Sequence, residues 1–149
     1  MNHHGGLSIF YLVFQQFITS MSLSKIRKIK LSKYDKQWSK TAREKTPYCE
    51  YCKITEGLNA HHFKGRSCKS TRLMMENAVI LCTSHHVFNH IFSAHRTPEK
   101  FERWFKKTFP KRHRAIIKKA QTMMSEREAI KEFINEQIGK EAQQTPQAV

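Results

Sequence analysis

The chain has 149 residues, enough for one modest domain with tails, and 39% of them are hydrophobic. Its 27 Lys and Arg residues against 12 Asp and Glu residues give a formal net charge of +15, spread over most of the sequence. This excess indicates a polyanionic partner, of which nucleic acid is the commonest, and the alternative is a basic protein without such a role. The four cysteines occur with nine histidines, which argues against a secreted disulfide framework.

Residues 1–20 contain an apolar run, LSIFYLVFQQFITS, interrupted by Gln15 and Gln16. The run is too short and too polar for a membrane span, and it lacks the basic start of a signal peptide. We therefore expect an extension upstream of a start at Met21, or a loosely packed helix, with an anchor or a signal as the alternative. We expect no stable membrane partner and a cytoplasmic location.

Residues 21–47 form a basic arm. Within it, KYDKQWSKTAREK predicts a short helix with Tyr34 and Trp38 on one face, ending before Pro47. The arm can lie along nucleic-acid phosphates. Alternatively, it is a solvated helix with Trp38 pinned to the core. The sequence does not separate these two interpretations, and both can hold.

All four cysteines and most of the histidines lie in residues 48–95. The local patterns there predict a cysteine knuckle, a strand, a basic loop, a second strand and a helix, over residues 47–52, 57–63, 64–76, 77–82 and 83–92.

Helices are expected in residues 96–139. Thr97 is a candidate N-cap with Pro98 at the first helical position, and aromatic residues form the buried face. Pro110 marks a break, and residues 112–124 predict a basic helix. Ser125 and Glu128 predict a capping box for the last helix, with Gly139 as its stop. The tail, residues 140–149, has the composition of a disordered segment.

Two knuckles lie about 30 residues apart, Cys49-x-x-Cys52 and Cys82-x-x-His85. Each places two soft donors within reach of one ion, and together they complete a tetrahedral site for structural Zn²⁺. The alternative is a pair of buried thiols with His85 on the surface. Cys68 lies outside both knuckles, so we expect a free thiol.

Four histidines remain outside that site. His86 and His90 are four residues apart on the predicted helix, so both rings can point at one place. His61 and His62 alternate across the predicted strand, so they point in different directions. One of the pair can therefore bind a metal while the other faces a substrate. The alternative is that these are ordinary surface or core histidines.

The order Cys-x-x-Cys, AHH, Glu76–Asn77 and Cys-x-x-His-His resembles the His-Asn-His (HNH) endonuclease family, with its ββα-metal fold. The resemblance covers roughly residues 48–92. The stretch DKQWSKTAR before the knuckle is similar to the corresponding segment of phage NinG/Rap-type recombination nucleases. The resemblance implies a role in phage recombination or DNA processing.

The resemblance also implies a role for each matching residue. His62 would be the general base that activates water, and Asn77 would brace the loop and orient His62. The catalytic metal would be bound by His61 and His86, with His90 as the candidate third ligand. This sequence has His61 where many members have Asp, and His85 where the fourth Cys is usual.

The chemistry is consistent with these roles. An imidazole with an ordinary pKa of about 6.5 can act as a base near neutral pH. One divalent ion can bind the phosphate and stabilise the departing oxygen. An imidazole-rich site favours transition metals, yet many nucleases use Mg²⁺, so Mg²⁺, Mn²⁺, Ni²⁺ and Zn²⁺ all stay open. Basic side chains of the loop can contact the DNA backbone, among them Lys64, Arg66 and Arg72.

We therefore expect an α+β protein, with a small ββα-metal (HNH) core and zinc knuckle flanked by helical N- and C-terminal extensions. The expected activity is metal-dependent hydrolysis of DNA phosphodiester bonds. The alternative is a non-catalytic zinc-binding module that binds nucleic acid, which would not need His62, His86 and His90 together. A protein whose histidines only store metal is a further alternative.

Overall fold

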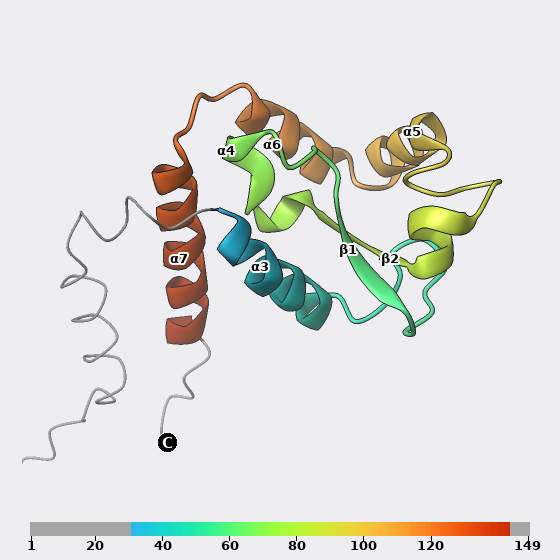
Figure 1. Ribbon diagram of the computed structural model, residues 1–149, viewed down its shortest axis with the longest axis horizontal. Coiled ribbons are helices and arrows are strands. Elements are labelled where there is room, and N and C mark those ends of the chain that lie inside the picture. The colour runs from blue at the N-terminus through green and yellow to red at the C-terminus, as the bar shows by residue number, and fades with distance from the viewer. Residues whose placement is uncertain (1–30, 144–149) are drawn as a thin grey trace, which may run out of the picture.

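The computed structural model describes residues 31–143, so residues 1–20, the start of the basic arm and the end of the tail lie outside the described residues. Helices surround one two-stranded antiparallel sheet (Figure 1), so the α+β class is confirmed. In chain order the elements are α3 (Ser32–Lys45), β1 (Leu58–His62), α4 (Lys69–Arg72), the 3₁₀ turn η1 (Met75–Asn77), β2 (Ala78–Cys82), the π-helical turn η2 (Ser84–Phe88), α5 (Pro98–Thr108), α6 (Pro110–Ala120) and α7 (Glu126–Gln143).

Strand β2 is buried along its whole length, which explains its unbroken apolar sequence. Ala78 and Ile80 belong to one core cluster, with residues of α3 and α7. Val79 and Leu81 belong to a second cluster, with residues of α5 and α6. In Figure 1, α3 and α7 accordingly lie on one side of the sheet, and α5 and α6 on the other.

The register of the sheet places the adjacent histidines on opposite faces. His61 pairs with Val79, and His62 pairs with Ala78. Because directly opposed residues share a face, His61 lies on the side of α5 and His62 on the side of α3. The predicted alternation of the two imidazoles is confirmed.

The described part of the basic arm is a packed helix. Trp38 of α3 is 1% exposed, and its Nε1 donates a hydrogen bond to the Met74 carbonyl at 3.1 Å. Tyr34, one turn earlier, meets the Phe133 ring of α7 edge-on. The lysines of α3 face outward, so the helix has Trp38 in the core and a basic outer surface.

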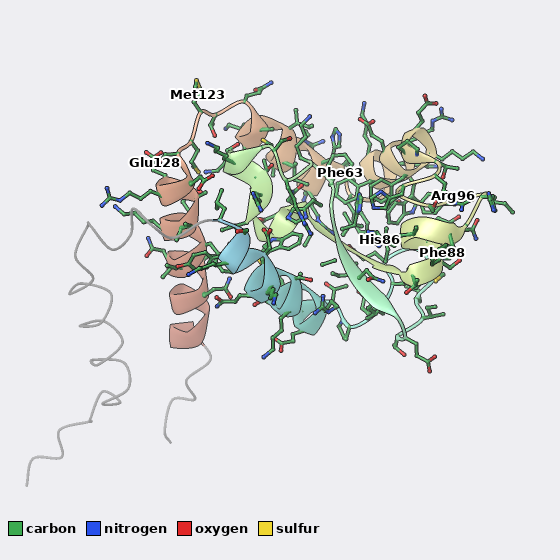
Figure 2. All side chains as sticks on the ribbon, in the orientation of Figure 1. Phe63, His86, Phe88, Arg96, Met123 and Glu128 are labelled. Carbon is green, nitrogen blue, oxygen red and sulfur yellow. The ribbon has the colours of Figure 1, made fainter. Side chains whose placement is uncertain are left out.

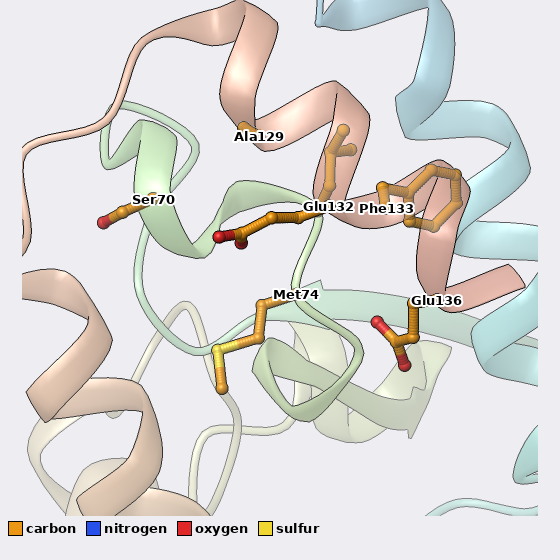
Figure 3. Close-up of a pocket in the computed structure, with 7 residues that line it drawn as sticks. Ser70, Met74, Ala129, Glu132, Phe133 and Glu136 are labelled. Atoms are coloured by element: carbon orange, nitrogen blue, oxygen red, sulfur yellow. The ribbon is translucent and has the colours of Figure 1, made fainter. Parts of the chain in front are cut away.

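Helix α7 begins as predicted and ends later. The capping box is present, because the Ser125 N–H and hydroxyl both donate to the Glu128 carboxylate, at 2.8 and 2.7 Å. The predicted stop at Gly139 is wrong, since α7 continues to Gln143 and takes in residues 140–143. A single glycine inside a helix costs only about 1 kcal/mol. Where α7 meets α4, a small hollow lies between Ser70, Met74 and Phe133 (Figure 3).

Two further boundaries differ from the predictions. The predicted helix over 83–92 is wrong, because η2 ends at Phe88 and Asn89 is extended. The Asn89 side-chain oxygen accepts hydrogen bonds from the N–H groups of Ile91 at 2.8 Å and Phe92 at 3.0 Å. These side-chain bonds take the place of the backbone hydrogen bonds that would continue a helix. The break predicted at Pro110 is confirmed, since α5 ends at Thr108 and α6 begins at Pro110, where proline suits the first helical position. The basic helix predicted over 112–124 instead runs over Pro110–Ala120.

Thr97 immediately precedes α5, as expected, but its hydroxyl bonds the Ser93 backbone instead of capping the helix. Within residues 31–143, no helix has the length and apolar character that crossing a membrane requires.

Candidate metal centres

The two predicted knuckles meet at one place. The donor atoms of Cys49, Cys52, Cys82 and His85 all lie within 4.8 Å of one another. The Cys52 and Cys82 sulfurs are 3.9 Å apart, close to the roughly 3.8 Å that tetrahedral zinc–thiolate bonds of about 2.3 Å impose. His85 presents Nδ1, 3.1 Å from the Cys82 sulfur. The four residues form a possible metal site consistent with structural zinc.

Cys68 lies outside this group, as predicted. Its sulfur is 3.5 Å from the Ser70 hydroxyl.

Electrostatics of the cysteines favour a bound cation. Burial raises the pKa of the Cys49 thiol, but backbone N–H groups, including that of Cys52, outweigh burial and lower it. Burial and the neighbouring sulfurs raise the pKa of Cys52 to about 11. Thiolates this close repel one another, and a cation bound between them would offset that repulsion.

A buried ion pair fixes the knuckle to the sheet and to α6. Glu50, 8% exposed, accepts the Ile80 N–H at 2.7 Å through one oxygen and Arg112 Nη1 at 2.5 Å through the other. Arg112 also donates to the carbonyls of Glu76 and Ala78. The sequence analysis missed this pair, since no local pattern joins residues that are 62 positions apart.

A second group of donors lies at His61, His86 and His95, whose ring nitrogens also fall within 4.8 Å of one another. The Nε2 atoms of His86 and His95 are 3.2 Å apart, close to the roughly 3.3 Å expected for imidazoles on one tetrahedral ion. Burial, and then the other two histidines, lower the pKa of His61 to about 3. Neutral imidazoles are the form that binds metals.

Backbone hydrogen bonds bring His95 to this place. The N–H of Ala94 donates to the His85 carbonyl at 2.9 Å, and the N–H of His95 donates to the His86 carbonyl at 3.2 Å. These two bonds hold the segment that contains Ala94 and His95 beside η2. One histidine of the group therefore comes from β1, one from η2 and one from the segment before α5.

His90, the possible third ligand in the sequence analysis, is not in the group. Its ring lies against Arg96, with Nδ1 2.9 Å from Arg96 Nη1. His90 follows His86 by four residues, but this spacing does not place the two rings on one helix face, because η2 ends at Phe88. In the sequence, Asn89 is the residue that could have indicated the end of the helix, since asparagine side chains compete with helical hydrogen bonds. Figure 2 shows Arg96 at the outer end of the loop, away from β1.

His62 lies on the opposite face of β1. Its ring stacks on Trp38 with the centroids 3.9 Å apart, and its Nε2 is 3.0 Å from the Arg72 carbonyl. A carbonyl only accepts, so Nε2 carries the proton and the lone pair is at Nδ1. Burial, followed by the charge of Arg66, lowers the pKa of His62 to about 4, so the ring is neutral at pH 7.

Asn77 is fully buried and braces the loop between the strands. Its Oδ1 accepts the Lys64 N–H at 2.7 Å, and its Nδ2 donates to the carbonyls of Lys64 and Thr71. It touches the loop backbone rather than the His62 ring, so any effect on His62 passes through the loop.

The three basic residues predicted to contact DNA fall into two kinds. Arg72 donates two hydrogen bonds to the Asp35 carboxylate, at 3.0 and 2.7 Å, and is therefore held by α3. Lys64 and Arg66 are exposed. Lys64 lines an open pocket together with His61 and, from α5, Glu102. One member of the three-histidine group, His61, therefore lines the same pocket as the positive side chain of Lys64.

Comparison of the chain with models of known protein families, with curated proteins and with solved structures finds no match.

Proposed function

We propose that this protein is a metal-dependent endonuclease that hydrolyses phosphodiester bonds of DNA. The observation that carries the proposal is a second donor group, His61, His86 and His95, separate from the cysteines and beside an open pocket that contains Lys64. A chain with a net charge of +15 attracts the DNA polyanion, and Lys64 places one positive charge at this pocket. The resemblance of the core to HNH endonucleases supports the same function.

Each residue has a proposed task. His61, His86 and His95 would hold one divalent ion, and three imidazoles favour Zn²⁺, Ni²⁺ or Mn²⁺ over Mg²⁺. When bound, such an ion supplies charge neutralisation at the phosphate and at the departing 3′ oxygen. Lys64 would contact a phosphate oxygen at the same pocket. The expected products carry a 5′-phosphate and a 3′-hydroxyl.

His62 is the proposed general base, accepting a proton from water at Nδ1. The Arg72 carbonyl holds the required tautomer, and the Trp38 ring fixes the plane of the imidazole. Asn77 keeps the following loop in place through its three backbone hydrogen bonds. The Cys49, Cys52, Cys82 and His85 group would hold structural Zn²⁺.

The test is nicking of supercoiled plasmid in the presence of Mg²⁺, Mn²⁺, Ni²⁺ or Zn²⁺, by the wild type and by His62→Gln. Glutamine keeps a donor for the Arg72 carbonyl and removes the base. We expect cleavage by the wild type and at least a 100-fold loss in the folded variant with unchanged metal content. Absence of cleavage with all four metals, or equal rates in the two proteins, would overturn the proposal.

One observation favours a second candidate, a non-catalytic zinc module that binds nucleic acid. His62 is only 9% exposed and packs like a core residue. This alternative predicts tight DNA binding without cleavage by any metal-loaded form, an outcome that the same plasmid experiment recognises.

A further inference from the structure

Helix α6 has two chemically different sides. One side is anchored in the protein, through the Arg112 ion pair with Glu50 and through Ile116, which is fully buried. The opposite side carries Lys111, Arg114 and Lys118, all exposed. Their spacing of three and then four residues puts them in one row along the helix, about 10 Å long at 1.5 Å per residue.

The charges of this row are not neutralised inside the protein. Helix α6 contains no Asp or Glu, and no ion pair within residues 31–143 reaches Lys111, Arg114 or Lys118. Lys111 lies in the first turn, where the helix dipole disfavours a cation, whereas Lys118 lies in the last turn, where the dipole favours one. Helix stability therefore accounts for Lys118 but not for Lys111, whereas an external anion accounts for the whole row.

The helix that carries the row also lines the candidate catalytic pocket. Ile117, between Arg114 and Lys118 in the sequence, lines that pocket together with His61 and Lys64. Helix α4, which follows the basic loop, packs against α6. A polyanion held on the row would therefore lie on a helix that borders the pocket.

We infer that the α6 row, Lys111, Arg114 and Lys118, binds the sugar–phosphate backbone of duplex DNA and leads it to the pocket. A DNA strand carries one charge per 3.4 Å of helix axis, so a row of about 10 Å spans several phosphates. The row has no aromatic side chain on which unpaired bases could stack, which argues against single strands. Contacts of this kind position DNA without reading its sequence.

This inference deepens the proposed function, because it names the surface that presents the substrate, yet binding can be measured without cleavage. The probe is a labelled 30-base-pair duplex, titrated by fluorescence anisotropy with the full-length, zinc-loaded protein at several salt concentrations and without added divalent metal. The test variant is Lys111→Gln/Arg114→Gln/Lys118→Gln. The matched control is Lys100→Gln/Arg103→Gln/Lys107→Gln, which removes two lysines and one arginine, all exposed and with the same spacing, from α5.

We expect the slope of log affinity against log salt to fall by about 2–3 in the α6 variant, since each phosphate contact contributes about 0.9. At 0.1 M salt this corresponds to a loss of roughly 100-fold or more in affinity. The α5 control should keep the wild-type slope. Zinc content and thermal melting check that both variants are folded.

Equal slopes for the wild type and the α6 variant, or equal losses in both variants, would overturn the inference. Tighter, row-dependent binding of single-stranded DNA or of duplex RNA would also overturn it. If the row binds duplex DNA but the wild type never nicks plasmid, the binding surface stands and the nuclease proposal fails. If plasmid is nicked and the row is dispensable for binding, the nuclease stands and this surface fails.

Discussion

The indole of Trp38 stacks face to face on the imidazole of His62, with 14° between the ring planes. Helix α3 thus forms one wall around the candidate general base, although it precedes β1 by a knuckle and a loop. The indole also donates to the Met74 carbonyl, in the segment that follows α4. One side chain therefore ties together α3, the end of β1 and the loop between the strands.

Removal of the Trp38 ring should strongly destabilise the fold. Trp38→Ala leaves a cavity in the core and is expected to lower the free energy of unfolding by about 3–5 kcal/mol. Trp38→Phe keeps a ring against His62 and loses the Nε1 hydrogen bond, so it should cost less. Urea denaturation of the zinc-loaded protein measures both values. A cost below about 1 kcal/mol for Trp38→Ala would contradict the packing described above.

The Asp35–Arg72 pair should make stability fall in acid. Burial raises the pKa of the Asp35 carboxyl, but the hydrogen bonds and charge of Arg72 outweigh burial and hold that pKa below its usual value. The unfolded chain therefore takes up this proton at a higher pH than the folded chain. Stability is present above about pH 4 and is lost as the pH falls through the folded-state pKa.

Asp35→Asn is the matching variant. It should cost roughly 1.5–3 kcal/mol at neutral pH and should flatten the loss of stability below about pH 4. Urea melts between pH 3 and pH 7 provide the comparison. An unchanged acid limb in Asp35→Asn would show that other carboxylates govern it.

Two residues between the knuckle and β1, Lys53 and Gly57, have positive φ and should respond in opposite ways to substitution. Lys53 has φ of 69°, a left-handed conformation that costs a residue with a side chain about 1 kcal/mol, so Lys53→Gly should raise stability by up to that amount. The loss of the Lys53 side-chain bond to the Glu50 carbonyl reduces the gain. Thermal melting of the zinc-loaded variant measures the result, and a clear loss of stability would mean that the side-chain bond dominates.

Gly57 provides the opposite case. Its φ is +60°, and an added Cβ would lie 3.1 Å from the Thr83 hydroxyl oxygen. Gly57→Ala should therefore lower the melting temperature. A neutral result would indicate that the turn before β1 relaxes easily.

Loss of one knuckle ligand should remove zinc and unfold the centre of the protein. Cys49→Ser is expected to lose one equivalent of zinc per chain, because a small core depends on the binding energy of such sites. Cys68→Ser is the control, since this thiol lies outside the ligand group. Metal analysis and circular dichroism of both variants decide the point. Loss of zinc from Cys68→Ser instead would refute the ligand assignment.

Local patterns predicted those parts of the structure that depend on neighbours in the sequence. The Cys-x-x-Cys and Cys-x-x-His spacings identified the four clustered donors, and alternation along the strand separated His61 from His62. The unbroken apolar run of β2 is explained by burial on both faces.

The parts that were missed depend on tertiary contacts. The spacing of His86 and His90 predicted a shared site only if a helix continued, and Asn89 ends it. His95 reaches the site through backbone bonds to η2 that no periodicity encodes. Arg72 is ion-paired with Asp35, which is 37 positions away in the sequence. The sequence of the basic loop alone could therefore not show that Arg72 has a partner inside the protein.

The most direct measurement compares plasmid cleavage by His95→Ala and by His90→Ala, each with its metal content determined. Both variants remove one exposed imidazole close to η2, and only His95 belongs to the three-histidine group. The proposed function predicts that His95→Ala keeps the structural zinc, binds the second metal weakly and loses cleavage, while His90→Ala cleaves like the wild type. Full activity in His95→Ala, or loss of activity only in His90→Ala, would contradict a catalytic metal at His61, His86 and His95.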